Sequence, residues 1–240
     1  MSEKIDYGID APGVIRNLAI IGVLLLCLLF VPPFVVRGAT VNLHGFWIAG
    51  VVLLLEAGWM LLYSLKGKFR HRDRMLAMAN LRGDEQVLDI GTGRGLLLVG
   101  AAKRLATGRA LGLDIWKASD LSGNARAKTE QVLEQEGVAD RCRLLERPAQ
   151  DTGLPDASFD VILSNLCLHN ISARAERDAA CREIVRLLKP GGTAIISDFK
   201  NTAQYAKVFE AAGLKVRRSY HAGDCFPPLT VVEARNPKPS

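Results

Sequence analysis

Residues 86–95 read QVLDIGTGRG, and this stretch decides the fold. A short, mostly apolar run leads into three closely spaced glycines, Gly91, Gly93 and Gly95, and a further apolar run follows to residue 106. This pattern is typical of a buried strand, a tight turn and a helix. Glycines in such a turn let a ligand approach the backbone closely, and the N-terminus of the helix favours a negatively charged group.

The same alternation continues to the end of the chain. Six further strands are expected at 110–115, 141–146, 159–166, 193–199, 215–221 and 229–235, with helices at 95–106, 124–137, 173–188 and 202–213. Strands that alternate with helices build a mostly parallel sheet covered on both faces. The sequence therefore predicts an α/β, Rossmann-like domain over residues 75–240, with its last two strands as an antiparallel pair.

An acidic residue ends the second strand and points to the ligand. Asp114 follows Gly91 by 23 residues, the position from which a carboxylate accepts hydrogen bonds from ribose hydroxyls. The loop is G-x-G-x-G and does not match the dinucleotide pattern G-x-G-x-x-G, because residue 96 is Leu. Asp89, two residues before the first glycine, suits the ammonium group of S-adenosylmethionine better than a pyrophosphate, and the methionine carboxylate could meet the loop amides. A nicotinamide-linked dehydrogenase is the disfavoured alternative.

At this point the sequence resembles the class I S-adenosylmethionine-dependent methyltransferases. The matching stretches are VLDIGTGRG, GLDI, PAQDTGLPDASFDVILSNLCLHNI and LLKPGGTAIISDF, within residues 86–199. The pattern is closest to the small-molecule group that includes ubiquinone/menaquinone and sterol methyltransferases. The resemblance implies a seven-stranded sheet in the order 3-2-1-4-5-7-6.

The resemblance also implies positions for the site. Ala149 and Gln150 would contact adenine, and Asn165 and His169 would lie near the methyl group. The predicted cofactor residues are Asp89, Gly91, Thr92, Gly93, Gly95, Asp114, Ile115, Ala149, Gln150 and Asn165. Arg94, within the loop, is either a solvated cation or a carboxylate clamp. Residues 116–124 depart from the family pattern and are expected to line the substrate entrance.

The first 74 residues predict a membrane hairpin. The stretch 17–36 carries no charge and is long enough to cross a bilayer as a helix, and a second apolar run at 41–65 carries only Glu56. The two spans are expected at about 15–36 and 43–65. A carboxylate at membrane depth, such as Glu56, is costly, so protonation or pairing within a homo-oligomer is expected of it, with a catalytic role as the disfavoured alternative. Two helices in a soluble core, or a cleaved signal peptide, are the alternatives.

Charge and cysteine content indicate where in the cell the domain lies and which kinds of site it lacks. Residues 1–74 and 75–240 each carry a net charge of +3, and the basic excess clusters at 66–74. This cluster favours a membrane surface over nucleic acid, and it predicts a multi-pass protein whose catalytic domain is cytoplasmic. The five cysteines form no CxxC pair, so neither a disulfide framework nor a metal site is expected.

These features predict a membrane-anchored methyltransferase for a small, lipophilic acceptor. An acceptor hydroxyl or carbon would need a base, and His169 and His221 are the candidates. A non-catalytic cofactor-binding adaptor, a soluble small-molecule acceptor, and a metalloid methylated through Cys167 and Cys225 stay open. A chain that starts near Arg74 is expected to bind cofactor, because the predicted adenosine contacts all follow that residue.

We predict that Asp114→Ala weakens S-adenosylmethionine binding. The change removes charge-assisted hydrogen bonds to the ribose hydroxyls, which costs about 1.5–3 kcal/mol. Calorimetric titration of the wild type and the variant measures the difference. An unchanged affinity in the variant, or tight binding of NADH by the wild type, contradicts the assignment.

Overall fold

A computed structural model describes residues 5–117 and 125–238. It divides the chain into two compact units, one formed by residues 9–66 and the other by residues 67–240 together with the N-terminal residues up to Gly8. The sequence placed this boundary after Arg74, whereas the structure places it after Lys66. Of the predicted entrance segment 116–124, residues 118–124 lie outside the described part of the chain.

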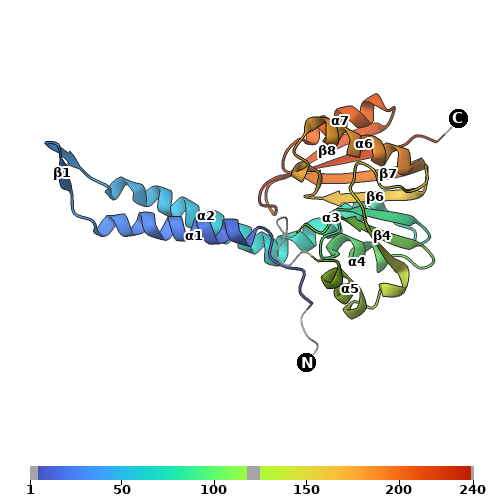
Figure 1. Cartoon of the computed structure of the whole chain (residues 1–240), viewed down its shortest axis with the longest axis horizontal. Coiled ribbons are helices and arrows are strands. Elements are labelled where there is room, and N and C mark those ends of the chain that lie inside the picture. The colour runs from blue at the N-terminus through green and yellow to red at the C-terminus, as the bar shows by residue number, and fades with distance from the viewer. Residues whose placement is uncertain (1–4, 118–124, 239–240) are drawn as a thin grey trace. The chain divides into compact units, whose positions relative to one another are not determined.

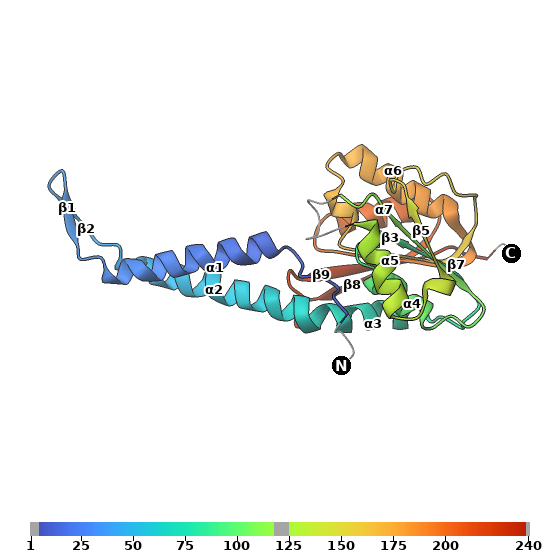
Figure 2. The same cartoon turned by 60° about the horizontal axis from the view of Figure 1, so that its bottom comes forward.

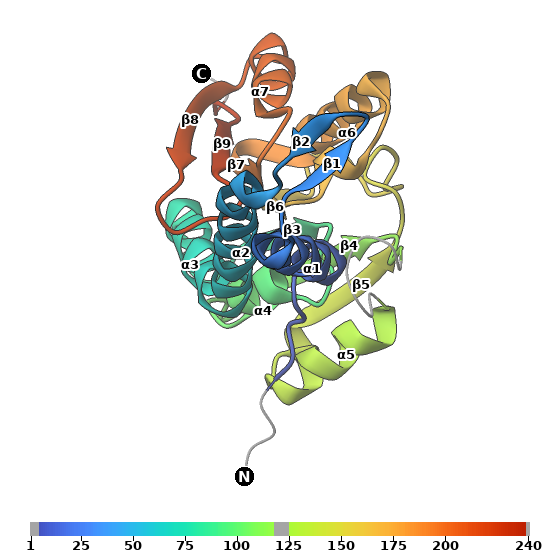
Figure 3. The ribbon, with the colours of Figure 1, turned by 90° about the vertical axis from the view of Figure 1, so that its left-hand side faces the viewer.

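The larger unit contains a seven-stranded sheet in the order β5-β4-β3-β6-β7-β9-β8. Figure 3 shows the strands in this sequence, from β8 at one edge to β5 at the other. Numbered from the first strand of this unit, the order is the 3-2-1-4-5-7-6 that the resemblance implied. Adjacent strands from β5 to β7 pair in parallel, and β9 pairs antiparallel with both β7 and β8. The strands are Gln86–Ile90 (β3), Arg109–Asp114 (β4), Cys142–Glu146 (β5), Phe159–Asn165 (β6), Leu188–Asp198 (β7), Lys215–His221 (β8) and Leu229–Arg235 (β9).

Helices cover both faces of this sheet (Figure 1). Residues that alternate along each strand enter two separate apolar clusters, since successive side chains point to opposite faces. Leu88 and Ile162 pack with α6 and α7, whereas Val87 and Val161 pack with α3, α4 and α5. The helices are Lys68–Ala79 (α3), Leu96–Ala102 (α4), Arg126–Gln135 (α5), Arg174–Leu187 (α6) and Thr202–Ala211 (α7), with single 3-10 turns at Ala139–Arg141 and Leu168–Asn170.

Helix α3 corrects the interpretation of the basic cluster. The sequence assigned the basic cluster 66–74 to a membrane surface, but most of this cluster lies in α3, which begins at Lys68. Lys68 and His71 are buried with Met75 and Leu76, at the i, i+3, i+7, i+8 spacing of one helix face. Lys68 Nζ donates to the carbonyl oxygens of Tyr7 and Gly8 at 3.2 and 2.5 Å. A chain that starts near Arg74 would lack these buried groups, so we no longer expect it to fold as the full domain does.

The smaller unit is a helical hairpin. Pro12–Cys27 (α1) continues into the 3-10 turn Leu28–Phe30, and the helical part stops before Pro32 and Pro33, as a proline pair dictates. A short ribbon of Phe34–Val36 (β1) and Ala39–Val41 (β2), which the sequence did not predict, leads through the turn His44–Phe46 to Trp47–Leu62 (α2) and the π-helical turn Tyr63–Gly67. Figure 2 shows α1 and α2 side by side, joined through this ribbon.

Two glycines let the hairpin helices touch. A Cβ atom on Gly50 would lie 2.8 Å from the carbonyl oxygen of Gly22, and one on Gly22 would lie 3.0 Å from that of Gly50. By length and composition, the helices Pro12–Phe30 and His44–Ala79 are each able to cross a membrane. Only 6% and 22% of the residues in their apolar windows are buried.

We predict that Met75→Ala destabilises the larger unit. Met75 has no exposed surface, so truncation leaves a cavity that costs about 2–4 kcal/mol. For a domain of this size the melting midpoint falls by roughly 5–15 °C. Arg70→Ala changes an exposed residue of the same helix and serves as the control, with a shift near zero expected. Scanning calorimetry of the detergent-solubilised chain measures both; equal shifts would mean that α3 is not part of this core.

Candidate functional site

The glycine loop between β3 and α4 is held by a close approach to β6. A Cβ atom on Gly91 would lie 2.3 Å from Cys167 Sγ, and the backbone there has a φ of +75°. Only glycine satisfies both conditions without strain. The loop therefore lies directly against the residues that follow β6, where the sequence predicted the methyl group.

The loop amides are used within the protein. Gly91 N and Thr92 N donate to Leu113 O at 2.7 and 3.2 Å, and Gly95 N donates to Thr92 O at 2.7 Å. Gly93 N donates to Asp114 Oδ2 at 2.8 Å. Three of these amides fix the loop to β4, and the expectation that loop amides meet the methionine carboxylate stays a prediction.

Asp89 provides the negative group beside the loop. It is buried, and its Oδ2 accepts a 2.8 Å hydrogen bond from Thr92 Oγ1, whereas its Oδ1 is buried without a hydrogen-bond partner. Burial raises the pKa of this carboxyl to about 7. A buried acceptor that lacks a donor fits a cationic ligand group such as an ammonium.

Asp114 and the next residue, Ile115, have side chains that can bind a nucleoside. Asp114 Oδ1 accepts from Trp116 N at 2.7 Å and its Oδ2 accepts from Gly93 N, so two backbone amides fix this carboxylate at the end of β4. Ile115 follows, with an apolar side chain that is 50% exposed and can cover one face of an adenine. Ala149 belongs to a buried apolar cluster, whereas the side chain of Gln150 is half-buried. These residues follow β4 and β5, on the same edge of the sheet as the loop.

His169 is oriented by an acid that sequence reasoning missed. Its Nδ1 lies 2.8 Å from Asp198 Oδ1, an ion-pair distance without hydrogen-bond geometry, and its backbone N donates to Asp198 Oδ2 at 3.0 Å. Asp198 is fully buried, ends β7, and also accepts from Tyr205 Oη at 3.3 Å. The signal was its position, since an acid at the carboxyl end of a central parallel strand faces the ligand edge.

A second polar group, centred on His71 of α3, lies toward the other face of the sheet. His71 Nε2 is 2.7 Å from Ser197 Oγ, and its Nδ1 is 3.2 Å from a guanidinium nitrogen of Arg74. Ser197 pairs in register with Asn165, whose Oδ1 is buried without a hydrogen-bond partner. Burial, reinforced by the charge of Arg74, lowers the pKa of His71 to about 4, so its ring is neutral at pH 7.

His221 belongs to this second group. Its ring centroid lies 6.2 Å from that of His71, and burial lowers its pKa. Arg74 closes the group by an ion pair with Asp224 at 2.5 Å. The two predicted bases therefore have different surroundings, because His169 contacts Asp198 and Phe199 whereas His221 contacts Ser219 and His71. Sequence reasoning assigned His71 to a lipid-facing segment and so did not include it.

The thiols are poor candidates for metalloid chemistry. Burial raises the pKa of the Cys167 thiol above its ordinary value and that of Cys225 to about 11. Thiolates are the reactive form, so neither thiol is activated at neutral pH. Among the described residues, no group of three or more His, Cys, Asp or Glu side chains is placed to hold a metal ion.

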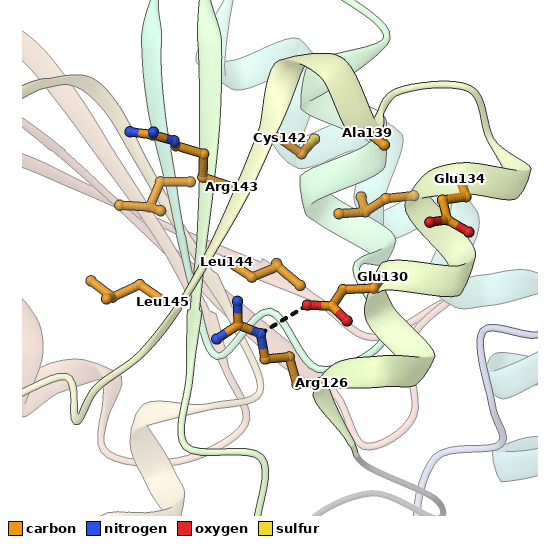
Figure 4. Close-up of a pocket in the computed structure, with 10 residues that line it drawn as sticks. Arg126, Glu130, Glu134, Ala139, Cys142, Arg143, Leu144 and Leu145 are labelled. Atoms are coloured by element: carbon orange, nitrogen blue, oxygen red, sulfur yellow. Dashed lines mark hydrogen bonds and ion pairs between the residues drawn. The ribbon is translucent and has the colours of Figure 1, made fainter.

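One groove of the larger unit lies outside the candidate site. It has a volume of about 560 Å³ and lies between α5 and strands β4 and β5, where Arg126 and Glu130 form a 2.9 Å ion pair (Figure 4). None of its lining residues is a predicted site residue. The chemistry of the acids and the glycine loop, not the size of a groove, locates the candidate site.

The sheet has the strand order that the resemblance to class I methyltransferases implied, with a glycine loop after its first strand and an acid at the end of its second. A family model described as "Methyltransferase domain" matches residues 88–196. The chain therefore contains a class I S-adenosylmethionine-dependent methyltransferase domain, and S-adenosyl-L-methionine is its cofactor.

Individual relatives agree with this assignment. The ribosomal protein L11 methyltransferase of Thermus thermophilus is 33% identical, with 69% of this chain and 57% of that protein covered. A ubiquinone/menaquinone biosynthesis C-methyltransferase of Hydrogenovibrio crunogenus is 30% identical, with 54% and 48% covered. The chain thus spans about half the length of these curated relatives. A SAM-dependent methyltransferase from Aquifex aeolicus shares the fold, with a TM-score of 0.55, 19% identity, and 69% of this chain and 89% of that chain covered.

We predict opposite effects of Asp89→Asn on stability and on binding. The native pKa of Asp89 lies above its ordinary value, so its contribution to stability is fully present below pH 3.8 and is lost as the pH rises through about 7. The neutral variant should therefore melt at a higher temperature than the wild type at pH 8, with a smaller gap at pH 5. It should also bind S-adenosylmethionine more weakly at pH 8, since a buried charge partner is lost. Thermal melts at both pH values and calorimetry measure these effects; a variant that melts lower at pH 8 contradicts the assignment of Asp89.

Proposed function

We propose that this protein is a membrane-anchored enzyme that transfers the methyl group of S-adenosylmethionine to a small, lipophilic acceptor. The observation that carries the anchoring is the exposed apolar surface of the hairpin. Ile20, Leu24, Ile48 and Leu55 are each more than half exposed. Helices of a soluble core would bury such side chains, whereas a bilayer accepts them.

The packing of the hairpin supports the same proposal. Close backbone contact through Gly22 and Gly50 is the small-residue packing that helices use in lipid, where apolar side chains alone give little drive to associate. The positive-inside bias favours a cytoplasmic catalytic domain with both ends of the hairpin on that side. Buried Lys68 takes no part in this bias, but Lys66 and Arg70 remain exposed.

The site residues have distinct roles in this proposal. Asp89 and Asp114 would hold the cationic and ribose ends of the cofactor, with Ile115 and Gln150 at the adenine. The bound cofactor supplies a methyl group on a cationic sulfonium, already a good electrophile. The chain's task is to align the acceptor and exclude water from the edge between β3 and β6.

His169 is the proposed base for an acceptor that must lose a proton. In this proposal the Asp198 carboxylate, 2.8 Å from Nδ1, stabilises the positive charge that the ring gains when Nε2 accepts the proton. His71 is less suited to this task, since Arg74 and Ser197 already occupy its two ring nitrogens.

The lipophilic class of the acceptor follows from the anchor. A water-soluble acceptor gains nothing from a tethered enzyme, whereas a bilayer-dissolved one meets the site at a raised local concentration. Quinone-, lipid- and isoprenoid-like compounds belong to this class, and one relative's name places it in ubiquinone/menaquinone biosynthesis. Incubation of the reconstituted chain with labelled-methyl cofactor and fractionated membrane lipids would identify the product. An Asp114→Ala chain gives the background, and no label above it would favour the non-catalytic adaptor.

We predict that the hairpin is needed for membrane-presented acceptor only. A variant in which a short Gly/Ser linker joins Gly8 to Gly67 retains every described residue of the larger unit. It should bind S-adenosylmethionine as the full chain does, but turn over acceptor in vesicles at least about tenfold more slowly. Acceptor dissolved in detergent is the control and should be methylated equally by both proteins. Equal turnover on the same vesicles would refute the lipophilic-acceptor proposal.

A further inference from the structure

The described N-terminal residues lie against the cofactor loop. Arg94, within the loop, donates to Asp6 Oδ2 at 2.6 Å and to the Asp6 carbonyl oxygen at 3.3 Å. Its side chain is only 10% exposed, so it is not the solvated cation considered above. A Cβ atom on Gly8 would lie 3.2 Å from Arg94 Nε, and the φ of Gly8 is +73°. The segment thus packs directly on the guanidinium.

Five further contacts fix this segment. Tyr7 is buried, its hydroxyl donates to Glu136 Oε1 at 2.5 Å, and its ring meets that of Phe69 edge-on at 5.7 Å. Lys68 holds the carbonyl oxygens of Tyr7 and Gly8, as described above. Gly8 N donates to Asp6 Oδ1 at 2.8 Å, which turns the carboxylate toward Arg94 and lowers the pKa of Asp6. Because of these contacts, Asp6 is held on a rigid segment, not on a free end of the chain.

We propose that Asp6–Gly8 is a positioning segment of the cofactor site, and that Asp6 acts through Arg94 on the glycine loop. Arg94 follows Gly93, whose amide is held by Asp114, so fixing the arginine restrains the turn that carries this hydrogen bond. Asp6 also neutralises a loop cation that would repel the positive charges of S-adenosylmethionine. The proposal rests on cofactor binding at this loop and adds a requirement for residues that precede the hairpin in sequence.

The test measures cofactor affinity and loop exchange in the full chain, reconstituted in lipid nanodiscs. Asp6→Ala should raise the dissociation constant of S-adenosylmethionine about 3- to 10-fold, the range for losing one exposed ion pair and its hydrogen bonds. In the cofactor-free protein, the Gly93 amide should exchange hydrogen faster. Asp6→Glu should restore most of the affinity. In an Arg94→Gln background, Asp6→Ala should cause no further loss of cofactor affinity, because the two residues act together.

Asp156→Ala is the matched control. Asp156 is as exposed as Asp6, at 78% against 77%, and it also pairs with an arginine, Arg186. Its variant should change neither the affinity nor the exchange of Gly93. Unchanged affinity and exchange in Asp6→Ala, with the wild type binding normally, would overturn the positioning role alone. A wild type that does not bind S-adenosylmethionine would overturn the cofactor site and this inference together.

Discussion

The contact between Gly91 and Cys167 is the constraint on which the site depends. With a would-be Cβ only 2.3 Å from the sulfur, any side chain at residue 91 would push the turn after β3 away from the residues after β6. The turn would then lose its amide bonds to Leu113 O, and with them the position of Asp89 and Thr92. The site is therefore built by backbone proximity first and by side-chain chemistry second.

Two polar groups lie at the carboxyl ends of the parallel strands, one toward each face of the sheet. Strand alternation places Asp198 toward α6 and α7, where it meets His169 and Tyr205, and places Ser197 toward α3, where it meets His71. Adjacent residues of one strand thus support two different environments. One contains an imidazole beside a buried carboxylate, and the other contains an imidazole held neutral beside a guanidinium.

Helix α3 joins the basic cluster to the core. Four of its residues are buried, and Lys68 ties the N-terminal segment to the same helix. The residues just before and just after the hairpin therefore belong to one compact unit. Consequently, the hairpin enters the chain as an insertion between two parts of the domain, and its removal needs a cut at Gly8 and Gly67, not at Arg74.

The sequence alone determined the strand–helix alternation, the glycine loop, Asp89 and Asp114, because hydrophobic period and turn chemistry are local properties. With the resemblance, it also predicted the strand order. It did not reveal the partners of these groups. Lys68 and His71 look like surface cations in a basic run, and only the packing of α3 shows that they are buried. Asp198 and His169 are 29 residues apart, and Asp6 and Arg94 are 88 apart. Such contacts depend on which faces and strand ends the fold brings together, so only the tertiary structure decided them.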